Sequence, residues 1–199
     1  MRKLSILAVA AVLGFPAMAF AGDYGTTGVI EVGGEVSIQN DSVATKPKGG
    51  SETTGTVTSI RLAPEVGYFL MDQLELIGAL RISSSSTGGD GAKSSSSGFG
   101  LGVGAAYLLP LGGIHAGPRA TIGFGSDSVT QGEGAAKISY SAAGPEINLG
   151  GVAKVPFGTG GILGAGLNIS FSPKSLGGDA KGDQTTTGFG LGTSFSVYW

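Results

Sequence analysis

Few residues of this chain could perform catalysis or hold a metal ion. The chain has no cysteine, which excludes thiolate chemistry and cysteine-ligated metals. Its single histidine is His115, and the run His115-Ala116-Gly117 places no serine or acidic residue beside it to act as nucleophile or orienting group. We therefore predict no catalytic residue and no metal site.

Two glycine-rich stretches imitate nucleotide-binding loops without meeting their requirements. In the sequence GDGAKS at 89–94, Ala92 stands where a phosphate loop has the glycine before its lysine, and no helical pattern follows. The glycines from Gly98 to Gly104 alternate with apolar residues, so they fit a strand and not a strand-to-helix turn. No cofactor is expected.

Charged residues are the remaining candidates, because a group of them would share one face if the chain forms strands. An enclosed charge needs a partner, since lone buried charge is costly. Counting along the expected strands places Glu35 near Arg61, and Arg119 near Glu146 with Asn168 beside it. Such a network could be a polar plug or a gate whose ion pairs rearrange. The inward group comprises Glu31, Glu35, Arg61, Glu65, Glu75, Arg81, Arg119 and Glu146.

The elements that would position these residues are strands, because apolar and small or polar residues alternate with period two through most of the chain. The segments are 28–39, 55–70, 74–84, 98–109, 114–126, 137–153, 161–172 and 186–199. Long connections rich in Gly, Ser and Thr (40–54, 85–97, 127–136, 173–185) alternate with short ones (71–73, 110–113, 154–160). This alternation predicts an all-β fold, an eight-stranded antiparallel up-and-down transmembrane β-barrel with long extracellular loops and short periplasmic turns.

In each predicted strand, alternate positions carry the large apolar residues. We call these positions the apolar parity, and we predict that they face lipid. In 98–109 the large residues alternate with successive glycines, and a face of glycines offers no hydrophobic core. The composition agrees, because only 13% of residues are charged and the mean hydropathy is +0.26. A net charge of -2 with scattered basic residues gives no indication of nucleic-acid binding.

Aromatic residues on the apolar parity gather at both ends of the expected strands, as interfacial girdles do. Tyr68, Tyr107 and Trp199 lie at the short-turn ends, and Phe99, Phe124, Phe171 and Phe189 lie at the long-loop ends.

The N-terminus has the pattern of a secretory signal peptide. Met1-Arg2-Lys3 is positively charged, and an apolar run follows. Ala19-Phe20-Ala21 is a small-x-small cleavage site, with cleavage expected after Ala21 or, alternatively, after Ala19. We predict a signal peptide over 1–21 and a barrel domain over 22–199.

Three prolines, Pro64, Pro118 and Pro145, fall inside predicted strands, where each removes a hydrogen-bond donor. The apolar parity changes from Ile138 and Tyr140 to the odd-numbered residues after Pro145, which predicts a β-bulge there.

Two stretches carry a resemblance to known proteins. RLAPEVGYFL at 61–70, followed after a short turn by LELIG at 74–78, resembles a hairpin of small bacterial outer-membrane β-barrel families of the OmpX, OmpA-barrel and OmpW sort. The closing alternation Phe195, Val197, Trp199 resembles their C-terminal assembly signal.

The resemblance implies the outer membrane of a Gram-negative bacterium, contact with its lipids, recognition by the barrel-assembly machinery, and a monomer. It implies a non-enzymatic surface or envelope module with protruding extracellular loops. The alternative is a narrow channel for small solutes, hydrophobic ones included. A third reading is an outer-membrane lipid-modifying enzyme, because such enzymes with this architecture use a histidine with a serine and an acidic partner.

Overall fold

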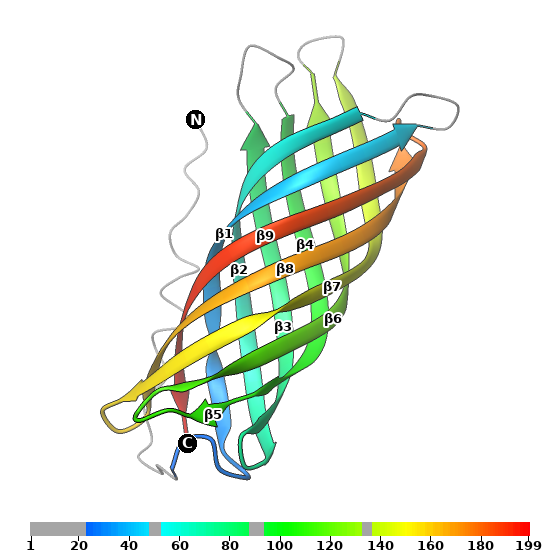
Figure 1. Ribbon diagram of the computed structural model, residues 1–199. Coiled ribbons are helices and arrows are strands. Elements are labelled where there is room, and N and C mark those ends of the chain that lie inside the picture. Colours follow the sequence, from blue (N-terminus) through cyan, green and yellow to red (C-terminus); the bar gives the residue numbers. More distant parts are fainter. Residues whose placement is uncertain (1–22, 48–52, 88–93, 133–136) are drawn as a thin grey trace.

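The chain folds into a closed antiparallel barrel (Figure 1). The computed structural model describes residues 23–47, 53–87, 94–132 and 137–199. These contain nine strands: β1 (Ile30–Pro47), β2 (Thr53–Met71), β3 (Leu74–Thr87), β4 (Ser94–Tyr107), β5 (Leu109–Pro110), β6 (His115–Gln131), β7 (Ile138–Phe157), β8 (Gly161–Gly178) and β9 (Gly182–Tyr198). No helix in these ranges is long and apolar enough to cross a membrane.

Two pairings close the sheet on itself. β4 pairs with β6, which leaves the two-residue β5 in a turn, and β1 pairs with β9 from Glu31↔Tyr198 to Pro47↔Gly182. Apart from β5, eight strands thus complete the ring, and the predicted eight-stranded barrel is confirmed. The predicted signal peptide, residues 1–21, lies outside the described residues.

The strands are longer than the sequence pattern predicts, and they extend into segments expected to be long loops. β6 and β7 stay paired as far as Gln131↔Ile138, and β8 and β9 as far as Leu176↔Gly182. The expected loop 40–54 is strand at 40–47 and 53–54. The prediction of long loops was wrong there because neighbouring backbones pair whether or not the side chains are apolar.

The barrel has two distinct ends. The short-turn end, at the bottom of Figure 1, holds the β2–β3, β5–β6 and β7–β8 turns and the C-terminus. The opposite end, here called the tip end, holds the other four hairpins.

The outer face carries large exposed apolar side chains, including Leu101, Val103 and Leu149. They form a band fit for contact with lipid. Ser and Thr residues replace them towards the tip end, and we call the exposed ones the hydroxyl collar: Ser84, Ser95, Ser97, Ser126, Ser128, Ser139, Ser141, Ser175 and Thr187.

The prolines do not create the predicted bulge. β6 and β7 pair without a register shift from His115↔Lys154 to Gln131↔Ile138. The ladder between β7 and β8 is interrupted from Ala143↔Ser175 to Ile147↔Phe171 but keeps its register, so Pro145 and Pro173 face each other. Ile138 and Tyr140 therefore stay on the inward parity. The bulge prediction was wrong because an inward apolar residue near the open tip end is not forced towards lipid: Ile138 is 46% exposed.

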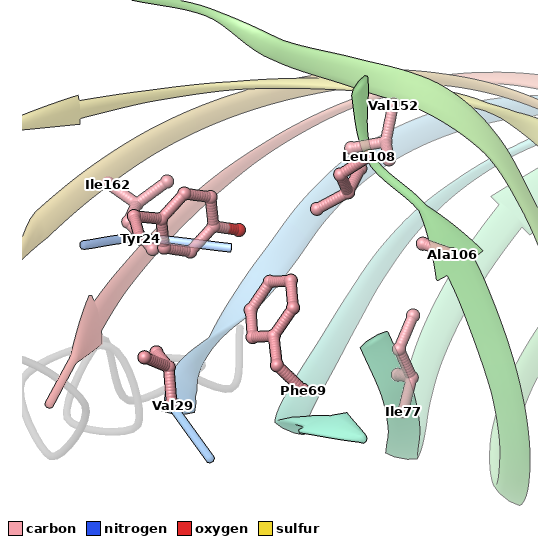
Figure 2. Packing of buried hydrophobic residues seen from close by; sticks show 8 residues of the cluster. All are labelled: Tyr24, Val29, Phe69, Ile77, Ala106, Leu108, Val152 and Ile162. Atoms are coloured by element: carbon pink, nitrogen blue, oxygen red, sulfur yellow. The ribbon is translucent and has the colours of Figure 1, made fainter. Parts of the chain in front are cut away.

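A small apolar cluster fills the barrel at the short-turn end (Figure 2). Phe69, Leu108 and Ile162 are completely buried within it. Leu108 points inward because it continues the inward parity of Ala106, and its N–H donates to the carbonyl of Gln73 at 2.7 Å. The remaining members are Tyr24, Val29, Ile77, Ala106 and Val152.

We predict that deleting Trp199 leaves exported but unassembled chains. Trp199 exchanges two backbone hydrogen bonds with Ile30, of 3.0 and 3.1 Å, and its ring is exposed at the outer surface of the closing strand. Deletion removes this final pair of the seam and an interfacial anchor. Heat-modifiable gel migration of membrane fractions measures assembly; full assembly of the truncated chain would contradict the prediction.

Candidate functional site in the barrel interior

The inward parity of the strands carries ion pairs arranged in three layers. We name them by their distance from the short-turn end: the lower layer (Glu31, Glu75, Lys154), the middle layer (Glu35, Glu65, Arg119) and the upper layer (Arg81, Asp127, Glu146, Lys174). Each layer joins strands from different parts of the ring.

The lower layer is the most enclosed. Lys154 Nζ lies 2.8 Å from Glu31 Oε2 and 3.0 Å from Glu75 Oε2. All three side chains are at most 8% exposed. The hydroxyls of Tyr24 and Ser196 also donate to Glu31, at 2.7 and 2.5 Å. These bonds compensate Glu31 for its lost hydration.

The middle layer is built around Arg119 of β6. Its guanidinium donates to Glu65 of β2 and lies 3.7 Å from Glu35 of β1. The expected pairing of Arg119 with Glu146 is therefore not made. Arg61 of β2 lines the cavity above this layer together with Glu35.

The upper layer contains a two-point contact between Arg81 and Glu146. Arg81 Nε lies 3.0 Å from Glu146 Oε2, and its Nη2 lies 2.8 Å from Glu146 Oε1. Planar guanidinium and carboxylate groups favour this geometry. Arg81 also binds Asp127 at 3.1 Å, and Lys174 contacts both acidic residues, at 3.0 Å from Glu146.

Inward glycines make room for these ion pairs. A Cβ atom on Gly125 would collide with Glu146 and Arg81, and one on Gly98 would collide with Asp127. The glycine face, which could have indicated an open conduit, is thus largely occupied by long charged side chains from neighbouring strands.

A cavity of about 60 Å³ lies between the middle and upper layers. Arginine and glutamate side chains of both layers line it, with the backbones of inward glycines such as Gly102 and Gly166. Asn168 Oδ1 is buried in its wall without a partner, whereas Asn148 donates to Thr121 at 3.2 Å. A cavity of this size with charged groups in its wall can hold a few water molecules.

The structure places every sequence-predicted charged residue in the interior. Glu35 and Arg61 line the same cavity, as expected, whereas Arg119 pairs with Glu65 and Glu35 and not with Glu146. Asp127, Lys154 and Lys174 were not among the predicted interior residues, because all three fall in segments predicted to be loops or turns. A usable signal was present: Lys154 shares the parity of Glu146, so extending the alternation past 153 predicts it inward.

The predicted girdle aromatics all lie exposed on the outer face of the barrel: Tyr68, Phe99, Tyr107, Phe124, Phe171, Phe189 and Trp199. Of the closing-strand residues, Phe195 and Trp199 are exposed and Val197 is half-buried.

His115 lies against the ring of Tyr24, with ring centroids 4.9 Å apart. Its Nδ1 is buried without a hydrogen-bond partner, whereas a catalytic histidine is oriented through that atom by an acidic group. Among the described residues, no group of three or more His, Cys, Asp or Glu is placed to hold a metal ion.

No protein-family model matches the chain, and no curated protein matches it. Among solved structures it is similar to the outer membrane protein OprG from Pseudomonas aeruginosa, with 11% identity, a TM-score of 0.54 and coverage of 87% of this chain and 97% of that chain. It is also similar to Ail, the attachment invasion locus protein of Yersinia pestis, with 11% identity, a TM-score of 0.50 and coverage of 86% and 100%. The chain thus has the fold of small outer-membrane β-barrel proteins.

We predict that Gly125→Ala destabilises the barrel by about 1–3 kcal/mol, because the new methyl group displaces the Arg81–Glu146 contact. Gly166→Ala is the matched control: its Cβ would meet one atom within 4 Å, the Gly151 carbonyl oxygen at 3.3 Å, and would point into the cavity wall. Denaturant unfolding followed by the fluorescence of the single tryptophan measures both. Equal losses would contradict the prediction.

We also predict that Arg119 couples more strongly to Glu65 than to Glu146. Removing one partner of an enclosed pair strands the other, so Arg119→Met and Glu65→Gln should together cost less than their sum by about 1 kcal/mol or more. The Arg119→Met and Glu146→Gln pair is the control and should be closer to additive. Double-mutant unfolding cycles decide this, and a stronger coupling to Glu146 would refute the assignment.

Proposed function

We propose that this protein is a non-enzymatic module of the bacterial outer membrane that acts through its surface-exposed end and not by conduction through the barrel. The observation that carries this proposal is the filled interior: three ion-pair layers and an apolar cluster follow one another along the axis. The outer-membrane location rests on the shared fold and on the lipid-facing band.

The tip end supports a role at the cell surface. On β6, Phe124 is the last large apolar residue of the outer face, and the strand continues to Gln131. At about 3.3 Å per residue and a tilt of about 35–45°, this extension rises roughly 15–20 Å above the band. The surface element is therefore a tube formed largely by paired strands, in place of the protruding loops expected from the sequence.

The hydroxyl collar suits exposure to an aqueous or saccharide environment, because its Ser and Thr side chains donate and accept hydrogen bonds without carrying charge. We infer that the tube presents the hairpin tips to other surfaces or ligands, and that the barrel below is the anchor. Lipids of the outer membrane and the assembly machinery are the partners this anchor requires, and the proposed unit is a monomer.

The competing function is a narrow conduit for small solutes, and the cavity between the middle and upper layers favours it. A conduit requires the layers on both sides of that cavity to open. Flux through the wild-type barrel separates the two functions directly.

We predict no flux of ions or small apolar solutes through wild-type protein in liposomes. Arg81→Ala, Arg119→Ala and Lys154→Ala combined with Tyr24→Ala should raise leakage, because these changes remove a blocking side chain from each ion-pair layer and from the apolar cluster. Lys137→Ala with Lys181→Ala removes two exposed cations near the tips and should not. Selective wild-type flux for one solute class would establish the conduit instead.

The surface role itself is tested on cells. A variant lacking the paired tip residues 128–131 and 138–141 keeps the lipid-facing band and the upper ion-pair layer but shortens one hairpin. We expect loss of cell aggregation, surface attachment or detergent resistance relative to wild type, at equal levels of assembled protein. Unchanged behaviour in all three assays would overturn the surface role.

A further inference from the structure

We propose that residues 23–29 form a cap that closes the short-turn end of the barrel once the β1–β9 seam has formed, and that this cap seals the interior from solvent on that side. The proposal does not depend on the surface function, because it concerns the opposite end of the molecule.

Tyr24 is the centre of the cap. Its ring packs edge-on against His115 of β6 and Phe69 of β2, with centroid distances of 4.9 and 5.3 Å. It also contacts Tyr198 of β9, at 5.1 Å. Its hydroxyl donates to Glu31 of β1. In the ring, β6 is separated from β1 by β9, β8 and β7, so Tyr24 spans the opening. These contacts can coexist only after the ring has closed.

Backbone hydrogen bonds hold the cap to β2. Gly28 N–H donates to the carbonyl of Phe69 at 2.8 Å, and Phe69 N–H donates to the carbonyl of Val29 at 2.9 Å. The cap thus continues the β1–β2 ladder beyond the start of β1, where it turns across the end of the barrel. Figure 2 shows Tyr24, Val29 and Phe69 grouped at this end.

The β2–β3 turn supplies a second attachment. Thr27 donates from both its N–H and its hydroxyl to Asp72 Oδ1, each at 2.9 Å. These bonds favour the ionised form and hold the pKa of Asp72 below its ordinary value. Gln73 N–H donates to the carbonyl of Gly25 at 2.7 Å, and the Gln73 carbonyl accepts from Leu108.

Two residues in this attachment have left-handed backbone conformations. Gly25 has φ of +88°, and a Cβ atom there would lie 3.2 Å from the His115 ring, so glycine is needed. Gln73 has φ of 70°, a conformation that costs a residue with a Cβ atom free energy. Its hydrogen bonds on both sides offset that cost and join the cap to the β4–β5 connection.

The low solvent exposure of the charged residues beneath the cap indicates that the cap seals the short-turn end. Glu75 is 2% and Lys154 4% exposed although both lie close to the end of the tube. Tyr24 and the apolar cluster separate these charges from the short-turn end. Removing the Tyr24 ring leaves an opening bordered by Phe69, His115 and Tyr198.

Thiol labelling can test the seal cleanly because the chain has no cysteine. Val152→Cys places a reporter of similar size in the buried cluster, where Val152 is 7% exposed. In the purified, folded protein we expect slow reaction with a charged maleimide, and at least a tenfold faster reaction after Tyr24→Ala is added. Tyr107→Ala is the matched control, because this tyrosine is exposed on the outer face.

A second variant covers the case in which Tyr24→Ala fails to assemble. Thr27→Val with Asp72→Ala weakens the attachment of the cap to the turn without altering the buried cluster and should also accelerate labelling. A Ser85→Cys reporter, at the tip end, should react equally in all backgrounds. Fast labelling with the cap intact, or no acceleration by either cap variant, would overturn the seal.

Refolding experiments test whether the cap closes after the β1–β9 seam has formed. Pulse labelling of the Val152→Cys variant should show protection arising with or after the compact, heat-modifiable form. Protection that precedes this form would refute closure of the cap after the seam.

Discussion

Every feature of this molecule depends on the need to satisfy backbone hydrogen bonds where no water is available. The β1–β9 seam meets that need by turning a sheet with two edges into a ring. Once the ring is closed, side chains alternate between the interior and the outer face, which meets lipid along the apolar band. The interior must then be filled by whatever the inward parity carries, which here is mostly glycine, serine and charge.

Filling the ring with charge imposes its own requirements. Lys154 is paired with two carboxylates, those of Glu31 and Glu75. Arg81 is also paired with two, those of Asp127 and Glu146, and Lys174 is a second cation beside Glu146. Partnered in this way, the charges avoid the cost of enclosure and link strands that are distant in sequence. The apolar cluster at the short-turn end completes the filling, so the interior behaves as a core built largely from ion pairs.

The sequence pattern was sufficient for the architecture because alternation is strongest where lipid demands apolar residues. It failed where that demand ends. Asp127 and Lys174 lie towards the tip end, where neither face of a strand must be apolar, and so they read as loop residues. Ile138 suggested a bulge for the same reason. Partners such as Glu65 for Arg119 depend on the stagger between non-adjacent strands, which no local pattern encodes. Tyr24 lies outside every strand and has no periodic signal at all.

The fit between glycines and facing charges has a consequence for how such a sequence can diverge. Gly125 and Glu146 share one volume, as do Gly67 and Glu75. A larger residue can replace either glycine only if the facing acidic residue is replaced by a smaller one. Interior substitutions therefore occur in pairs, whereas on the outer face one apolar residue can replace another independently. Homologous chains would keep the barrel fold after their sequence identity has become low, and their common origin would still be detectable from pairs of positions that covary.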